Sequence, residues 1–232
     1  MASVPGSGVG RVLAAAACIV LLAGCGAATD TNRLVDGVGA IRTETRAVGA
    51  FDKVEVRHGL ELRLVIGSPQ RVSVTARENL LAMTTTIVSE GRLVVEARQD
   101  FVSGDGIIAS VTTSTITELV LHDGAAGLVD GLDAVSLVVH VDHGATLTMT
   151  GSVGWLGLAS HGACVIDLGR LVARNVTVEL AQGVVVRIGV GDSISGSASG
   201  GVALTVCGDP PIVDVRTTEG STVNRRCDRN DG

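Results

Sequence analysis

Aromatic side chains are nearly absent from this sequence. Its 232 residues include no tyrosine, two phenylalanines and one tryptophan, although 46% of the residues are hydrophobic. A folded core must therefore consist mainly of valine, leucine, isoleucine and alanine. Such small side chains suit narrow coils, in which rings would push the layers apart. The shortage also argues against binding of sugars or nucleic acids by ring stacking, because such sites commonly use aromatic platforms.

A strong excess of one charge is missing as well. The formal net charge is −6 at pH 7, and acidic and basic residues are mixed along the chain. The sequence lacks the basic stripe that a nucleic-acid phosphate backbone would require. We therefore expect no nucleic-acid partner and interpret the charge as a contribution to solubility.

The N-terminal apolar run, Val12 to Ala23, is too short for a comfortable membrane span. It follows a single arginine and ends in Leu22-Ala23-Gly24-Cys25, which resembles the lipobox of bacterial lipoproteins. The resemblance implies that residues 1–24 are a signal peptide and that a lipid on Cys25 anchors the exported chain to the cell membrane, facing the extracytoplasmic side. An ordinary secretory signal with a chance cysteine is the alternative. Residues 25–46 are small and polar, and we expect them to form a flexible tether.

The second half of the chain repeats. A marker glycine recurs every 18 to 21 residues, and apolar residues stand one, three and five positions after it. The glycines are Gly124, Gly144, Gly162, Gly183, Gly201 and Gly220. Aligned on them, one predicted inward column is Ala125, Ala145, Ala163, Val184 and Val202, and another is Val129, Met149, Asp167, Ile188 and Val206, with the aspartate as a misfit.

Period-two alternation joined at glycines about every 19 residues is typical of a β-solenoid. One such unit cannot bury its apolar face alone, so stacked neighbours must complete the core. We therefore predict an all-β chain that folds as a parallel β-helix with coils of about 19 residues. A β-sandwich with regularly spaced hairpins is the alternative, although a sandwich has no reason to keep such a register.

The segment from Phe51 to Arg98 contains further short alternating runs. Ordinary hairpins and longer solenoid coils explain these runs equally well. Glu78 to Leu81 breaks the alternation and is interpreted as a loop or helical turn, and residues 84–88 and 93–97 as a strand pair. Residues 224–232 are expected to form a polar C-terminal tail.

Several of these motifs occur together in one known family. Phe51-Asp52-Lys53-Val54-Glu55-Val56, the later Gly91-Arg92-Leu93, the repeated Gly-Ala steps and Gly208-Asp209-Pro210 resemble the DUF2807 family, the putative auto-transporter adhesin head GIN domain. The resemblance covers residues 47–223. It implies that the β-helix is right-handed and that the protein is adhesin-like. The chain departs from the family pattern by placing histidine or glutamine where small residues are common.

The residues that precede the marker glycines are candidates for chemistry. Asp123, His143 and His161 fall in one predicted column with Gln182, and His122, Asp142 and Ser160 stand one step earlier. Imidazole and carboxylate groups at the spacing of adjacent coils could bind a divalent metal such as zinc. The alternative interpretation is a polar ladder at the solvent edge. No metal-binding motif with defined spacing is present, and we expect no cofactor.

The cysteines have separate expected roles. Cys207 and Cys227 are 20 residues apart, close to one coil, which would place them on neighbouring coils at a distance compatible with a disulfide. Cys164 has no evident partner and is expected to be a free, partly covered thiol.

Together these features predict an exported, lipid-anchored scaffold without catalytic machinery. Its expected partners are the membrane, through the N-terminal lipid, and a polysaccharide or protein ligand of the cell envelope. Contact would occur through stacked polar columns or through strand addition at a free edge. A metal-dependent enzyme or metal-binding protein that uses the histidine and aspartate column, and a purely structural envelope protein, are the alternatives.

Overall fold

The computed structural model describes residues 34–225 and 227. They belong to one compact unit, Asn32–Gly232. The expected signal peptide, residues 1–24, and the expected lipidation site Cys25 lie outside the described residues. Within the described part, no helix is long and apolar enough to cross a membrane.

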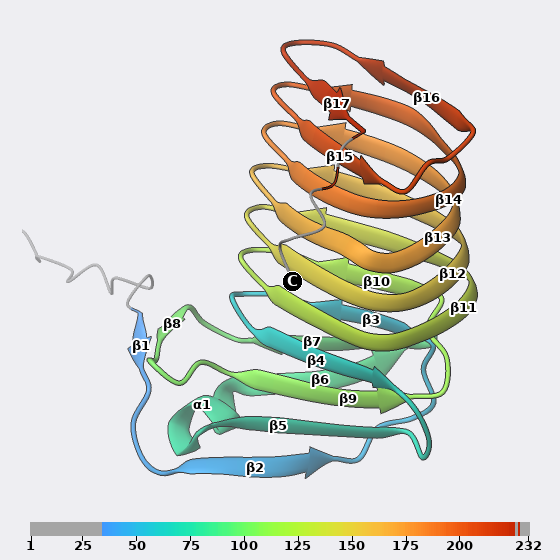
Figure 1. Ribbon diagram of the computed structural model, residues 1–232. Helices are drawn as coiled ribbons and strands as arrows, with labels where there is room; N and C mark the ends of the chain where they lie inside the picture. The colour runs from blue at the N-terminus through green and yellow to red at the C-terminus, as the bar shows by residue number, and fades with distance from the viewer. Residues whose placement is uncertain (1–33, 226, 228–232) are drawn as a thin grey trace, which may run out of the picture. The chain divides into compact units, whose positions relative to one another are not determined.

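Strands make up nearly all of the regular structure (Figure 1). The N-terminal elements are β1 (Val35–Asp36), β2 (Ile41–Arg46), β3 (Lys53–Val56), β4 (Glu61–Ile66), β5 (Arg71–Arg77), α1 (Glu78–Met83), β6 (Thr84–Ser89), β7 (Arg92–Ala97), β8 (Phe101–Val102) and β9 (Ile108–Thr113). The later elements are β10 (Glu118–Leu121), β11 (Ala126–Asp142), β12 (Thr146–His161), β13 (Val165–Ala181), β14 (Val185–Ser199), β15 (Ala203–Cys207), β16 (Ile212–Thr217) and β17 (Thr222–Asn224).

The long strands β11 to β14 are successive coils of a parallel stack, seen as parallel loops from green to orange in Figure 1. Ala126 pairs with Thr146, Thr146 with Val165, and Val165 with Val185, so each coil advances by 19 or 20 residues. β15 and β16 pair with the first and second halves of β14, and β17 pairs with β15. These pairings confirm the predicted β-solenoid.

The core lies inside the coils and consists of aligned apolar columns. Each column takes one residue from each coil, and its members are at most 3% exposed. One column is Ala125, Ala145, Cys164, Val184 and Val202, and another is Val129, Met149, Leu168, Ile188 and Val206. Aliphatic side chains of this size fill the narrow interior without rings.

The third coil is shifted by one residue from the predicted alignment. Leu168, not Asp167, pairs with Ile188, and Cys164 replaces Ala163 in its column. Asp167 points outward, in register with Arg187 on the next coil. The predicted inward position of Asp167 is therefore wrong, and the column has no misfit.

The cause of the shift lies in the turn that joins successive coils. Each turn contains two consecutive residues with positive φ, for example His143 (54°) and Gly144 (74°), or Gln182 (65°) and Gly183 (75°). In the third coil the order is reversed, because Gly162 (80°) precedes Ala163 (54°). Gly162 therefore stands beside His143, and its carbonyl group accepts a hydrogen bond from Gly144 N–H at 2.8 Å. The predicted alignment of glycine with glycine is broken there.

The N-terminal region combines both predicted alternatives. β3 and β4 are part of the parallel stack, because β3 pairs with β10 and β4 with β11. β6 and β7 form an antiparallel pair, as expected for residues 84–97, and β5 runs antiparallel to both β2 and β9. The break in alternation after Arg77 is the helix α1, which buries Leu80 and Leu81.

The expected tether is shorter than predicted. Residues 41–46 form β2, which pairs with β5 along its whole length, and β1 pairs with β8. β2 is polar because it is an outer strand with exposed side chains, such as Arg42, which forms an ion pair with Glu78. Its sequence therefore lacks the apolar periodicity that identifies the other strands, and a prediction based on periodicity missed it.

The left-handed Ala163 gives a direct test of the turn. Replacing Ala163 by glycine should raise the free energy of unfolding by about 0.5–1 kcal/mol, because a residue with a Cβ is disfavoured at φ 54° and glycine is not. The matched control is Ala159→Gly within β12, which should lower it by a similar amount. Urea denaturation of both variants measures the difference. A destabilised Ala163→Gly chain would contradict this description of the turn.

Candidate binding surface

The structure separates the three residues of the predicted metal column. Asp123 and His143 occupy neighbouring turns, with Oδ1 of the aspartate 3.7 Å from Nδ1 of the histidine. His161 instead pairs in register with Asp142 and Ala181. The shift of the third coil thus moves His161 into the adjacent column, next to Asp142 rather than His143.

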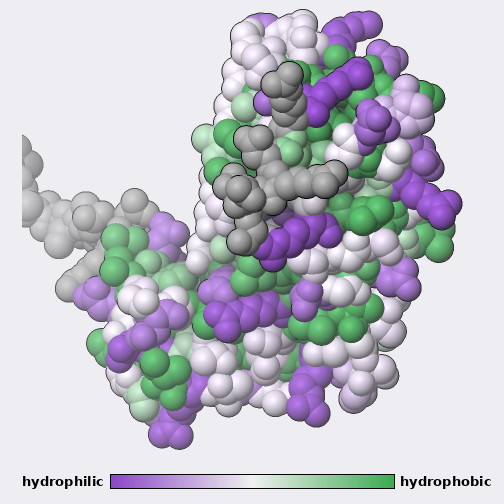
Figure 2. All heavy atoms as spheres, in the orientation of Figure 1, coloured by the Kyte–Doolittle hydropathy of each residue, from purple (hydrophilic) through white to green (hydrophobic). Residues whose placement is uncertain are grey.

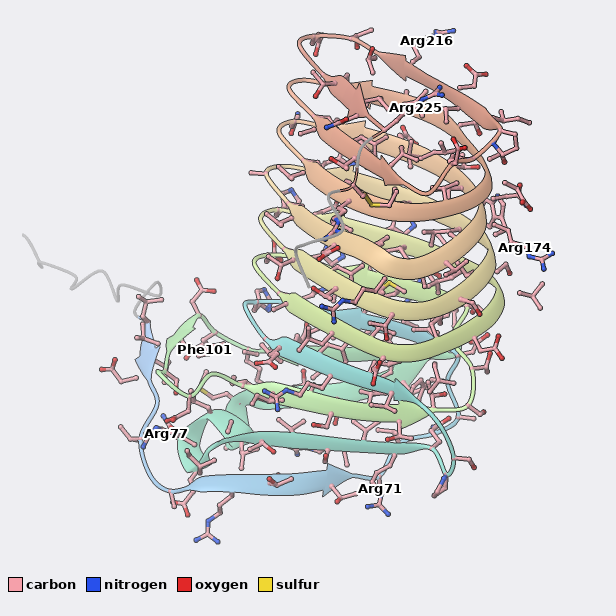
Figure 3. The ribbon with its side chains drawn as sticks, viewed as in Figure 1. Arg71, Arg77, Phe101, Arg174, Arg216 and Arg225 are labelled. Carbon is pink, nitrogen blue, oxygen red and sulfur yellow. A yellow bond between two sulfur atoms is a disulfide. The ribbon has the colours of Figure 1, made fainter. Side chains whose placement is uncertain are left out.

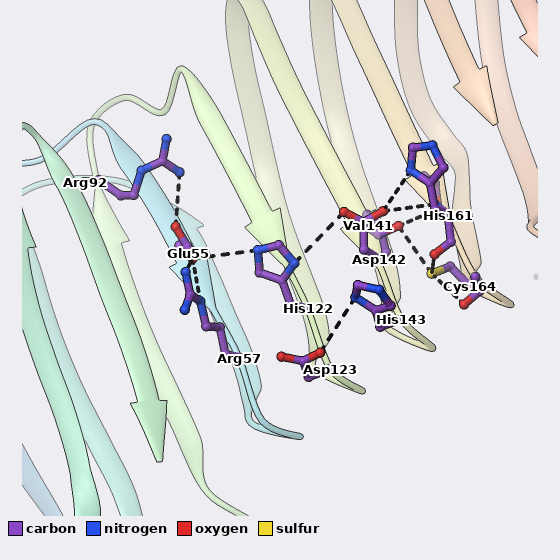
Figure 4. A network of polar contacts seen from close by, with 12 residues as sticks. Glu55, Arg57, Arg92, His122, Asp123, Val141, Asp142, His143, His161 and Cys164 are labelled. Carbon is purple, nitrogen blue, oxygen red and sulfur yellow. Dashed lines mark hydrogen bonds and ion pairs between the residues drawn. The ribbon is translucent and has the colours of Figure 1, made fainter. Parts of the chain in front are cut away.

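Asp142 is the centre of a polar ladder that crosses three coils (Figure 4). Its Oδ1 accepts a hydrogen bond from the backbone N–H of His161 at 2.9 Å and lies 3.3 Å from Nδ1 of the same residue. On the other side, Oδ2 lies 4.0 Å from Nδ1 of His122. Only 19% of the Asp142 side chain is exposed, so two imidazoles flank a largely covered carboxylate.

The ladder continues into the N-terminal strands. Nε2 of His122 lies 3.7 Å from Oε1 of Glu55, whose side chain is 8% exposed. Arg57 forms an ion pair with Glu55, and Arg92 approaches Glu55 at 3.4 Å. Arg92 also donates to both carboxylate oxygens of Glu118, at 2.8 and 2.9 Å. Two arginines therefore compensate the buried charge of Glu55, and sequence analysis missed all four of these residues.

The histidines and carboxylates meet in pairs rather than in a metal-binding cluster. Among residues 34–225 and 227, no three histidine, cysteine, aspartate or glutamate side chains are grouped so that they could hold a metal ion. The Asp123–His143 pair is also open to solvent, with 48% and 72% of the two side chains exposed. The described histidines and carboxylates are arranged as a polar ladder, and metal binding by Asp123, His143 and His161 stays a prediction.

The single tryptophan lines a shallow apolar groove on the same face of the stack. The indole of Trp155 covers Gly157, and a Cβ on that glycine would stand 2.7 Å from a ring carbon. The groove holds about 160 Å³, and Trp155, His140, Ala159 and Glu179 are among its lining residues. Trp155 is 40% exposed. An aromatic platform therefore exists here, although the composition argued against one.

A larger hollow lies between β8 and the turns of the stack, where the surface is indented in Figure 2. Its volume is about 510 Å³, within the range of small-molecule sites. Phe101, labelled on β8 in Figure 3, contributes a partly buried ring. The lining residues are His58, Gly59, Asp100, Phe101, Val102, Ser103, Gly106 and Asp123. Two aspartates, a histidine, a serine and a phenylalanine therefore line the hollow, although the Ser103 hydroxyl and Nδ1 of His58 are buried.

The remaining cysteines lie away from the hollow. Cys207 and Cys227 form a disulfide with a Cα–Cα distance of 5.2 Å, which holds the end of the chain beside β15. Cys164 is a free, buried cysteine, and its thiol donates to the carbonyl group of Val141 at 3.2 Å. It is fully buried rather than partly covered as expected, because the shift of the third coil places it in an inward column.

Comparison with known proteins identifies relatives of this fold. The family model DUF2807, described as "Putative auto-transporter adhesin, head GIN domain", matches residues 50–210. A putative adhesin from Bacteroides fragilis superposes with a TM-score of 0.64 at 15% identity, covering 82% of this chain and 99% of its own. A putative adhesin from Parabacteroides merdae gives 0.56 at 15% identity, covering 82% and 98%.

A third similar structure carries a different description. It is a putative lipid binding protein from Parabacteroides distasonis, with a TM-score of 0.50 at 13% identity, covering 83% of this chain and 99% of its own. No curated protein matches the chain. At these identities the solved structures establish a shared fold.

The Asp142 ladder makes a specific contribution to stability that can be measured. Replacing Asp142 by alanine should lower the free energy of unfolding by about 1–2 kcal/mol, because the backbone N–H group of His161 loses a charged acceptor. The matched control is Asp133→Ala, at an exposed position of the same strand, with an expected effect below about 0.5 kcal/mol. If urea denaturation showed the same decrease in the free energy of unfolding for both variants, the ladder would make no specific contribution to stability.

Proposed function

Because this chain belongs to the DUF2807 family, the putative auto-transporter adhesin head GIN domains, we propose that it is a non-catalytic, adhesin-like binding protein of the bacterial cell envelope. The descriptions of two similar structures as putative adhesins support this proposal. A stack of hydrogen-bonded coils suits such a function, because it holds surface groups in fixed positions without the entropy cost of ordering loops.

The hollow beside β8 is the observation that carries the proposal. Among the described residues it brings together groups from three separate segments: the turn at His58, the loop of Asp100 and Phe101, and the turn at Asp123. Concave sites with a few convergent polar groups around an apolar surface are the usual form of a binding site.

The chemistry of the hollow fits a hydroxyl-rich ligand. The carboxylates of Asp100 and Asp123 can accept hydrogen bonds from hydroxyl groups, and the ring of Phe101 offers an apolar face to the C–H groups of a sugar. Its lining residues include two aspartates and no lysine or arginine, so an anionic polymer would meet repulsion from the carboxylates. We therefore assign the ligand to an uncharged polysaccharide segment of the envelope.

Export and anchoring complete the proposed function. Cys25, after the apolar run, would carry the lipid, and about the first eight residues of the mature chain would connect it to the first described residue, Leu34. The binding unit would then lie outside the cytoplasm, close to the membrane surface, where envelope polysaccharides are present.

Removal of one carboxylate, that of Asp100, tests the proposed binding site. With cell-wall polysaccharide of the producing bacterium immobilised on a sensor, Asp100→Ala should weaken binding of the protein about tenfold or more, because a charged acceptor of ligand hydroxyls is lost. Asp133→Ala removes the same group from an exposed strand position outside the hollow and should leave the affinity unchanged. Phe101→Leu should weaken binding as well, through loss of the ring.

Chelation separates this function from the metal-dependent alternative. Binding should persist in excess EDTA, because no metal takes part in the proposed contacts. Affinity that vanishes with EDTA and returns with zinc would favour the alternative, and polysaccharide binding that ignores Asp100→Ala would place the site elsewhere. If the protein bound no envelope material at all, that result would favour the remaining alternative, a purely structural envelope protein.

The anchor is tested by fractionation. Cys25→Ser should transfer the protein from the membrane fraction to the soluble extracytoplasmic fraction, because the serine cannot accept the thioether-linked lipid. Cys164→Ser, which leaves the lipobox intact, should remain in the membrane fraction. Unchanged membrane association of Cys25→Ser would contradict the proposed anchor.

A further inference from the structure

The last coil of the stack has a free strand edge. Every coil strand from β11 to β13 pairs with a neighbour on both sides, whereas β16 pairs with β14 alone among the described residues. β16 spans six residues, Ile212–Thr217, and Figure 3 places Arg216 at this open end. An edge of this length is a ready template for pairing with another strand.

The direction of the backbone groups along β16 follows from one hydrogen bond. Thr218 N–H donates to the carbonyl group of Ala198 on β14 at 3.0 Å. Along a strand this direction alternates with period two, so the N–H and C=O groups of Val213, Val215 and Thr217 point to the free edge. These three residues offer six hydrogen-bonding groups.

The end of the core is also incompletely covered. Val213 and Val215 pack against the core but are only partly buried, as is Val223 on β17. Ile194 and Leu204, which pair with Val213 and Val223 from the preceding coil, are 0% and 1% exposed. The disulfide holds Cys227 beside Cys207 on β15, which belongs to the other half of the coil. Apolar side chains and unpaired backbone groups thus occur together at this end.

The charges on β16 are arranged so that the strand complements itself. Asp214 and Arg216 alternate with the inward valines and face outward, and neither forms an ion pair with another described residue. If two copies of β16 run antiparallel with Val215 opposite its own copy, Val213 lies opposite Thr217 and Asp214 lies opposite Arg216. In this register the residues whose backbone groups face the edge, Val213, Val215 and Thr217, occupy the hydrogen-bonded positions. Each Asp214–Arg216 pair occupies a non-hydrogen-bonded position, where opposite side chains are closer together.

We infer that β16 is a homodimer interface, at which a second copy of this chain adds its own β16 antiparallel around Val215. The two stacks then share a continuous sheet with two Asp214–Arg216 pairs, and each copy covers the open end of the other core. This is an isologous contact with a two-fold axis at Val215. The inference is independent of the polysaccharide site, which lies on the opposite part of the chain, at β8 and the first turns.

Cysteine cross-linking tests the register in the full chain within intact membranes. Val215→Cys should give, on oxidation, a disulfide-linked band of twice the monomer mass, because Cα atoms of a hydrogen-bonded antiparallel pair lie about 5.5 Å apart, within the disulfide range. Ile212→Cys is the matched control on the same strand. In this register Ile212 is about 20 Å from its own copy and should not cross-link.

The charged pairs give a second measurement. In the Val215→Cys chain, Asp214→Arg should reduce the initial rate of cross-linking about tenfold, because two attractive pairs become repulsive. Adding Arg216→Asp to it should restore the rate, since the exchanged charges again face each other. A merely destabilised strand would not recover in this way.

Each other result overturns the inference. No cross-link at Val215, or equal cross-linking at Ile212, would exclude the specific pairing. A linked band of another mass would show that a strand of a different protein occupies the edge. Should Val215→Cys fail to accumulate, Val213→Cys together with Thr217→Cys, which face each other in the same register, tests the same contact, and its failure to link would overturn it as well.

Discussion

The fold depends on one constraint, which is that equivalent residues of successive coils remain in register. Each coil has a single layer of inward side chains, so its apolar face is buried only if the next coil places similar residues at the same positions. The aligned columns from Ala125 to Val202 and from Val129 to Val206 satisfy this condition. Because the register is fixed, polar residues on the outer face also align, and the Asp142 ladder follows from the same constraint.

The sequence predicted the coil repeat because glycine spacing and alternation are both local signals. The same signals misplaced the third coil by one residue. The prediction aligned glycine with glycine, but a left-handed alanine costs only about 1–2 kcal/mol. Aligning Gly162 with Gly144 would instead have turned the Asp167 carboxylate into the core, which costs more. Burial of the apolar side chains therefore determined the register. The glycines align with one another in the other turns, but not in the turn of the third coil.

The candidate site was predictable only where it lies within the repeats. Asp123, His143 and His161 were found from their spacing, although His161 was assigned to the wrong column. Glu55 and Arg92 were missed because β3 lies between β10 and β7, an order of strands that does not follow the chain. The hollow was missed for a similar reason, since its residues come from segments up to 65 positions apart, His58 to Asp123. No local pattern connects such residues before the chain has folded.

The two ends of the stack differ, and this difference limits what the protein can assemble into. At the N-terminal end, β5 runs antiparallel to the coil direction and pairs with the outer strand β2, whose arginines are paired within the chain, Arg42 with Glu78 and Arg46 with Glu44. At the C-terminal end, β16 continues the coil and keeps its charges unpaired among the described residues. A head-to-tail contact would have to join these unlike ends and would extend without limit, whereas pairing of β16 with its own copy uses the free edge of both chains at once. Pairing of β16 with its own copy would therefore give a finite pair and not a filament.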